Sequence, residues 1–207
     1  MRGCVRVCVW LTLLGLTGAV GAQESEHLRG TLVAIEGDLV TVADADEEQR
    51  EVRLTEQTGL YVVTPAKFAD IEAGQYVGVT SVESEGGRVA LEVHVFAEDL
   101  RGTGEGHFPW DLVKEPNAIT NATIADIEEI SPVERLLRLT YKDGEGHSSQ
   151  GKQEILVPEF ADVVLLESAD RSVLVPERPV FMFLEATPSG PPTALAIAVG
   201  LGVAPPM

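Results

Sequence analysis

Residues 101–111, RGTGEGHFPWD, place an imidazole, two carboxylates, a guanidinium and an indole within eleven positions. His107 and Asp111 are side chains that could begin a Zn²⁺ or Cu²⁺ site, although a third or fourth protein ligand must come from elsewhere in the chain. The same segment could instead hold a small ligand. The candidate binding residues are Arg101, Glu105, His107, Trp110 and Asp111.

A structural role for this segment is the alternative hypothesis. The three alternating glycines permit positive φ angles or close backbone approach, and Pro109 fixes the chain before the indole. Phe108 and Trp110 would then fill a groove between two folded parts, because large aromatic side chains favour burial. Under this hypothesis, Arg101 and Asp111 pair to hold the ends of the segment.

No recognised catalytic motif accompanies these residues. GTGEG lacks the G-x-G-x-x-G spacing of dinucleotide-binding loops, and the chain contains neither G-x-S-x-G nor H-E-x-x-H. Both cysteines, Cys4 and Cys8, lie at the extreme N-terminus. We therefore expect a protein that is not an enzyme and that has no resident cofactor, a divalent metal excepted.

Residues 1–22 have the pattern of a cleavable secretory signal. Arg2 and Arg6 precede an apolar run that is too short to span a bilayer, and small residues follow at Val20 and Ala22. An uncleaved anchor is the alternative, and the short apolar run counts against it. We expect an exported protein, periplasmic or secreted, without stable membrane insertion after the signal is removed.

The charge balance restricts the partners of the protein. The whole chain has a formal net charge of −18, and loss of Arg2 and Arg6 with the signal makes it −20. Nucleic acids and anionic membrane surfaces are bound through Lys and Arg, so this balance excludes them as expected partners. An envelope protein or a small ligand remains.

The pattern of apolar residues favours β-structure throughout. Short valine-rich runs alternate apolar and polar residues between turn-forming clusters. In RVALEVHVF the alternation places Val89, Leu91, Val93 and Val95 on one face and Ala90, Glu92, His94 and Phe96 on the other. His94 is therefore expected at a surface.

The sequence also repeats internally. GTLVAIEG at 30–37 resembles ATIADIEE at 122–129, which places Leu32 opposite Ile124. ALEVHVF at 90–96 resembles ALAIAVG at 194–200. These matches predict two small OB-like β-barrel modules, at 28–97 and 119–200, joined by a Gly/aromatic linker at 98–118. A single sandwich with similar strands is the alternative.

The strand pattern, the RGTGEGHFPWD linker and the following TNATIADI together resemble exported bacterial two-module proteins with OB-like barrel domains of unknown function. The resemblance implies a fold and export, and it supplies no catalytic residues. One departure is Glu177, which stands in LVPERPV where IEAGQYV has Gly74. We expect a ligand- or protein-binding module of the cell envelope, with a metal-handling accessory protein that uses His107 and Asp111 as the alternative.

Overall fold

The computed structural model describes residues 26–142 and 150–205, which form a mainly β protein, as the alternating sequence predicts. Within these ranges, thirteen strands belong to one mixed sheet. The expected signal at 1–22 lies outside the described residues. In the described part of the chain, no helix is both long and apolar enough to cross a membrane.

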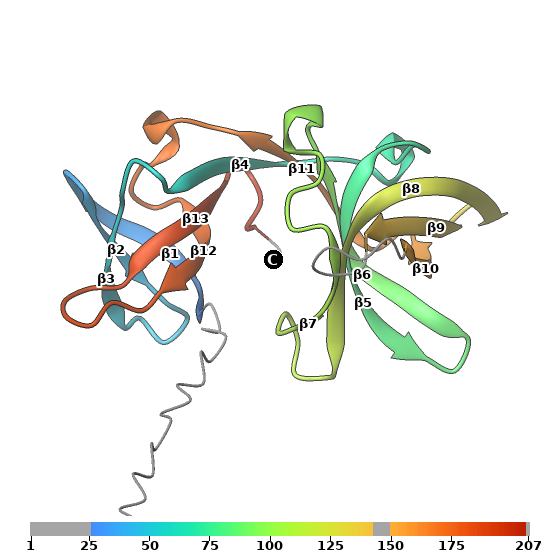
Figure 1. The fold of residues 1–207 in the computed structure, drawn as a ribbon, viewed down its shortest axis with the longest axis horizontal. Coiled ribbons are helices and arrows are strands. Elements are labelled where there is room, and N and C mark those ends of the chain that lie inside the picture. The colour runs from blue at the N-terminus through green and yellow to red at the C-terminus, as the bar shows by residue number, and fades with distance from the viewer. Residues whose placement is uncertain (1–25, 143–149, 206–207) are drawn as a thin grey trace, which may run out of the picture.

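One group of five strands comes from the two ends of the described chain and lies at the left of Figure 1. Its strands are β1 (Glu26–Glu36), β2 (Leu39–Ala43), β3 (Gln49–Arg53), β12 (Pro179–Glu185) and β13 (Thr193–Gly200). They pair in the order β13-β12-β1-β2-β3, and one parallel pair between Thr193 and Arg53 returns β13 to β3. We call this group the terminal ring.

A second group of five comes from the middle of the chain and lies at the right of Figure 1. Its strands are β5 (Tyr76–Ser84), β6 (Gly87–Phe96), β8 (Asn117–Ser131), β9 (Glu134–Lys142) and β10 (Gln150–Pro158). They pair in the order β10-β9-β8-β5-β6, and parallel pairing of Ile155 with Arg88 and of Leu156 with Val89 returns β10 to β6. We call this group the central ring.

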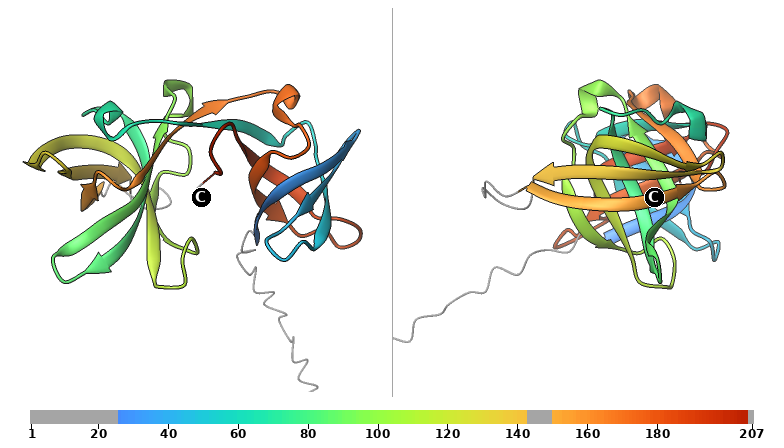
Figure 2. Two further views of the ribbon diagram at one scale, coloured as in Figure 1. Left: turned by 180° about the vertical axis from the view of Figure 1, so that it is seen from behind. Right: turned by 90° about the vertical axis from the view of Figure 1, so that its right-hand side faces the viewer.

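Two strands bridge the rings, β4 (Gly59–Pro65) and β11 (Asp162–Ser168). They pair antiparallel with each other, while β4 pairs with β13 and β11 pairs with β6. The bridge spans the top of Figure 1 and is seen from behind in Figure 2. Continuous hydrogen bonding therefore fixes the rings relative to each other.

Strand pairing does not follow the predicted ranges 28–97 and 119–200. The terminal ring joins β1, β2 and β3 to β12 and β13, and the central ring joins β5 and β6 to β8, β9 and β10. Each ring thus takes strands from both ranges. The predicted linker at 98–118 contains a short strand, β7 (Gly106–Trp110), which pairs antiparallel with β8.

The register of the two rings repeats at the positions that the sequence places opposite one another. Leu32 exchanges backbone hydrogen bonds with Glu177 and Arg178, and Ile124 exchanges them with Gly74 and Gln75. Both strands also carry a bulge at this place, between Leu32 and Ala34 and between Ile124 and Asp126. Positions in β5 and β6 therefore have equivalents in β12 and β13.

Apolar side chains form three buried clusters. One fills the central ring, with Val79, Val93 and Leu137 fully buried, and a second fills the terminal ring around Val42 and Met182. The third lies between the rings, and its buried members are Val63, Leu100, Val164, Leu166, Phe181 and Ala198. Leu166, Phe181 and Ala198 of this third cluster also line the candidate site.

Candidate functional site

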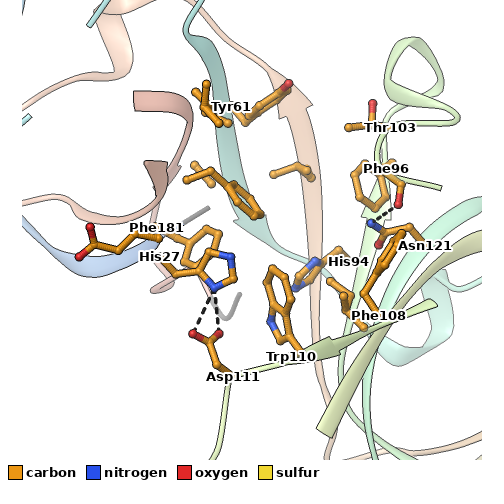
Figure 3. A pocket seen from close by; sticks show the side chains of 18 of the residues that line it. His27, Tyr61, His94, Phe96, Thr103, Phe108, Trp110, Asp111, Asn121 and Phe181 are labelled. Atoms are coloured by element: carbon orange, nitrogen blue, oxygen red, sulfur yellow. Dashed lines mark hydrogen bonds and ion pairs between the residues drawn. The ribbon is translucent and has the colours of Figure 1, made fainter. Parts of the chain in front are cut away.

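A pocket with a volume of about 970 Å³ lies between the two rings (Figure 3). Six of the eleven Phe, Tyr and Trp residues of the chain line it: Tyr61, Phe96, Phe108, Trp110, Phe181 and Phe183. Six polar side chains also line it: Glu26, His27, His94, Thr103, Asp111 and Asn121. A concave, mainly apolar surface with a few polar groups is typical of a small-molecule site.

Strand β7 brings the RGTGEGHFPWD segment to this pocket. Successive side chains of a strand point to opposite faces, so Phe108 and Trp110 line the pocket while His107 lines a different cavity. Gly106 has a φ of 148°, and the ring of Phe108 lies 2.4 Å from the place that a Cβ there would occupy. The positive φ favours glycine here, and a larger residue would also displace the ring of Phe108.

Trp110 connects β7 to the terminal ring. Its ring centroid lies 4.6 Å from that of His27 on β1, 6.1 Å from that of Phe181 and 5.9 Å from that of Phe183 on β12. The two phenylalanines pack edge to face at 5.0 Å. Trp110 thus fills space between the two groups of strands, as the structural hypothesis for this segment expects, whereas the side chain of Phe108 is 47% exposed.

Asp111 pairs with β1 and not with Arg101. Its carboxylate accepts a hydrogen bond of 2.9 Å from Arg29 Nη2, and it lies 3.1 Å from His27 Nδ1. Burial alone would raise the pKa of Asp111, but the hydrogen bonds from Arg29 and His27 outweigh it and lower that pKa. The expected pair of Arg101 with Asp111 is wrong, because Arg101 bonds Glu98 at 2.6 Å.

Arg101 and Glu105 make structural contacts outside the two cavities. Arg101 Nη2 donates to the carbonyl of Gly74, in the turn before β5. Glu105 accepts a hydrogen bond from the backbone of Lys142 at the end of β9. These contacts hold the segment against the central ring.

His107 and Asp111 line different cavities. His107 borders a cavity of about 800 Å³, with Arg88 and Glu83 among its neighbours, and its Nδ1 lies 2.8 Å from Thr120 Oγ1. Burial and the nearby charge of Arg88 lower the pKa of His107. Among the residues that the structure describes, no three His, Cys, Asp or Glu side chains gather as a metal site would require. The metal hypothesis stays a prediction.

The sequence analysis did not select two further residues of the pocket region, His94 and Glu92, as candidates. The expectation that His94 lies at a surface is wrong, because both side chains are 1% exposed. His94 Nε2 lies 2.7 Å from Glu92 Oε1, an ion-pair distance without hydrogen-bond geometry, and Thr80 Oγ1 donates to the same oxygen. The sequence does contain a pattern that could have identified this pair. An imidazole and a carboxylate two residues apart on a strand lie on the same face, as the alternation predicts.

Four buried polar atoms on the pocket residues lack a hydrogen-bond partner in the described structure: Nδ1 and Nε2 of His94, Trp110 Nε1 and Asn121 Oδ1. Asn121 Nδ2 donates to the carbonyl of Gly104 at 3.0 Å, which fixes the amide so that its oxygen is the unpaired atom. Buried polar atoms are nearly always hydrogen-bonded, so unpaired ones grouped at a cavity are typical of a binding site.

No protein-family model, curated protein or solved structure matches this chain.

Proposed function

We propose that this protein is a non-enzymatic binding protein of the cell envelope that holds a small, mainly apolar ring compound between its two rings of strands. The observation that carries the proposal is the concentration of six aromatic side chains around one cavity of about 970 Å³. This volume lies at the upper end of the range for small-molecule sites.

The arrangement of the aromatic side chains supports a ring-shaped ligand. Those of the terminal ring already pack at tilted and edge-to-face angles, with Phe181 against Phe183 and Trp110 beside both. A planar ring that enters the pocket gains the same kind of contact, worth about 0.5–1.5 kcal/mol for each aromatic pair beyond the area buried.

The remaining parts of the proposal concern place and fold. The N-terminal pattern at 1–22 supports export, and the strongly acidic chain supports a partner other than nucleic acid or an anionic membrane. We also propose that the terminal and central rings are two small OB-like barrels, because each path of five strands returns to its first strand. Barrels of this kind bind ligands on their faces and connecting loops.

Trp110 offers a direct test of binding, since the chain has only one other tryptophan, Trp10, within the expected signal. We would titrate the Trp10→Phe chain with N-phenyl-1-naphthylamine, a neutral two-ring dye, and excite the dye through Trp110. Saturable energy transfer with one dye per chain is expected. A linear signal without saturation would contradict the proposal.

Matched Phe→Glu variants locate the site. Phe183→Glu places a carboxylate in the aromatic wall and is expected to weaken dye binding at least about tenfold, because burying an unpaired charge is costly. Phe160→Glu changes the net charge equally at a residue that is 84% exposed and outside the pocket, and should leave binding unchanged. Equal effects of both variants would count against this site.

A further inference from the structure

The pocket has two unlike walls built from equivalent positions of the two rings. Strand pairing makes Gly78 and Thr80 of β5 equivalent to Phe181 and Phe183 of β12. In the same way, Glu92 and His94 of β6 are equivalent to Ala196 and Ala198 of β13. At these equivalent positions the terminal wall carries aromatic or small apolar side chains, whereas the central wall carries buried polar groups.

Two unpaired polar atoms of the central wall, Asn121 Oδ1 and His94 Nδ1, lie close to Gly78. A Cβ at this glycine would lie 2.6 Å from Asn121 Oδ1 and 3.4 Å from His94 Nδ1, so both atoms flank the same backbone position. Gly78 pairs with His94 on one side and with Asn121 on the other. The absence of a side chain at residue 78 therefore lets these two unpaired atoms, and the ring of Phe96 at 3.2 Å from the same place, lie close to the backbone. We call this position, where the two unpaired atoms come together, the recess.

Phe108 borders this recess. Its ring lies over Gly106, the strand partner of Asn121, and the close-up shows Phe108 beside Asn121 and His94 (Figure 3). Because Phe108 is 47% exposed, its ring has space to swing outward about χ1. Such a rotation gives a ligand group access to the recess from the pocket.

We infer that the recess formed by Gly78, His94 and Asn121 binds a hydroxyl group of the ligand, while the aromatic terminal wall holds its ring. The inference rests on the proposed function and names the ligand class as a hydroxylated ring compound. Asn121 Oδ1 can only accept, so the ligand group must donate a hydrogen bond. His94 Nδ1 accepts in one protonation state and donates in another. A hydroxyl group donates its single proton to Asn121 Oδ1, and its oxygen accepts a hydrogen bond from His94 Nδ1 in the state in which that nitrogen carries a proton.

A pair of probes of equal size tests this inference. 2-Naphthol and 2-methylnaphthalene differ only in the hydroxyl or methyl group, and each is used to displace N-phenyl-1-naphthylamine from the Trp10→Phe chain. Two hydrogen bonds predict that 2-naphthol displaces the dye at a concentration about fivefold lower. Equal potency of the two probes would overturn the inference while the proposed function stands. Failure of the dye to bind would overturn both.

Three variants assign the preference to the recess. Asn121→Ala removes the accepting oxygen, and the double substitution Glu92→Ala with His94→Ala removes both members of the buried pair, so that neither is left alone. Each of these two recess variants should reduce the preference for 2-naphthol to within about twofold. Leu195→Ala, on the terminal wall, should weaken both probes equally and keep the preference. A preference retained in both recess variants, with unfolding temperatures showing that they fold, would refute the inference.

Discussion

Trp110 packs the glycine-rich segment against the terminal ring, and its ring contacts provide most of the free energy that holds the two together. Its three ring contacts are each worth about 0.5–1.5 kcal/mol, whereas an exposed ion pair contributes about 0–1 kcal/mol. The neighbouring Asp111 side chain is 56% exposed. The aromatic contacts therefore outweigh the pairs of Asp111 with Arg29 and His27.

His107 gives the protein a predictable dependence of stability on pH. Burial and the nearby Arg88 lower its pKa in the folded state, so the unfolded chain binds the proton more readily. The contribution of neutral His107 is complete above its ordinary pKa of about 6.5, falls as the pH drops below that value, and is lost once the pH passes the lowered pKa. The free energy of unfolding should thus decrease between pH 7.5 and pH 5.

Comparison with His107→Gln isolates this effect, because His27 and His94 are present in both proteins. Urea unfolding of each protein across the same pH range gives two curves of the free energy of unfolding. The curve of the variant should be flatter below pH 6.5. Parallel curves would show that His107 has the same proton affinity in the folded and unfolded chains.

Residue types and spacing were enough to select Trp110 and Asp111 as candidates, and both line the pocket. They could not select Asn121, because its importance depends on Gly78, which lies across a strand pair, and on Gly104, whose carbonyl accepts from its amide. No local pattern reveals either contact. Arg101 and Glu105 have equally suitable side chains, but hydrogen bonds to Gly74 and Lys142 occupy them.

The turns before β5 and β12 have the same backbone shape built from different residues. Gly74 has a φ of 86° in the first turn, and Glu177 has a φ of 70° in the second. The left-handed region costs a residue with a Cβ about 1 kcal/mol or more. The departure of LVPERPV from the glycine pattern therefore keeps the geometry of the turn and adds backbone strain.

Replacing Glu177 by glycine should relieve this strain. Since glycine also gains freedom in the unfolded chain, we expect a net increase in the free energy of unfolding of about 0.5–1 kcal/mol, measured by urea unfolding. Glu177→Ala removes the same charge and retains the Cβ, so it should give little of this gain. An equal increase in both variants would attribute the effect to charge.

Strand alternation predicted most of the elements, but bulges limit what it says about faces. The register of β5 against β6 shifts between Thr80 and Ser81. Leu91 is the extra residue, because Thr80 pairs with Glu92 and Ser81 with Ala90. Leu91 was expected to point inward but lines the cavity near His107, and Ala90 lies in the core cluster. An extra residue in one strand reverses the faces that follow, and nothing in the alternation of RVALEVHVF reveals it.

At the scale of the whole molecule, similarity between two segments does not determine which strands each of them pairs with. The matches of Leu32 with Ile124 and of 90–96 with 194–200 predicted two successive modules. In the structure, the segments with Leu32 and Ile124 pair with strands of the other half, β1 with β12 and β8 with β5. The segments 90–96 and 194–200 pair with β5 and β12 of their own halves. Two successive modules and the observed structure would contain the same strand-to-strand contacts. They differ only in how the chain, through β4 and β11, connects the paired strands.

This interleaving predicts how the chain behaves when it is divided. A segment ending at residue 97 leaves β1 and β3 without β12 and β13, and leaves β5 and β6 without β8 and β10. Unpaired strand edges and a divided core make a small β-protein unstable. We therefore expect segments 23–97 and 98–207, produced separately, to show no cooperative thermal unfolding by circular dichroism. Produced together, they should copurify and unfold as one unit. If segment 23–97 folds cooperatively alone, the predicted module at 28–97 is an independent unit and the pairing across the two halves is not required for its stability.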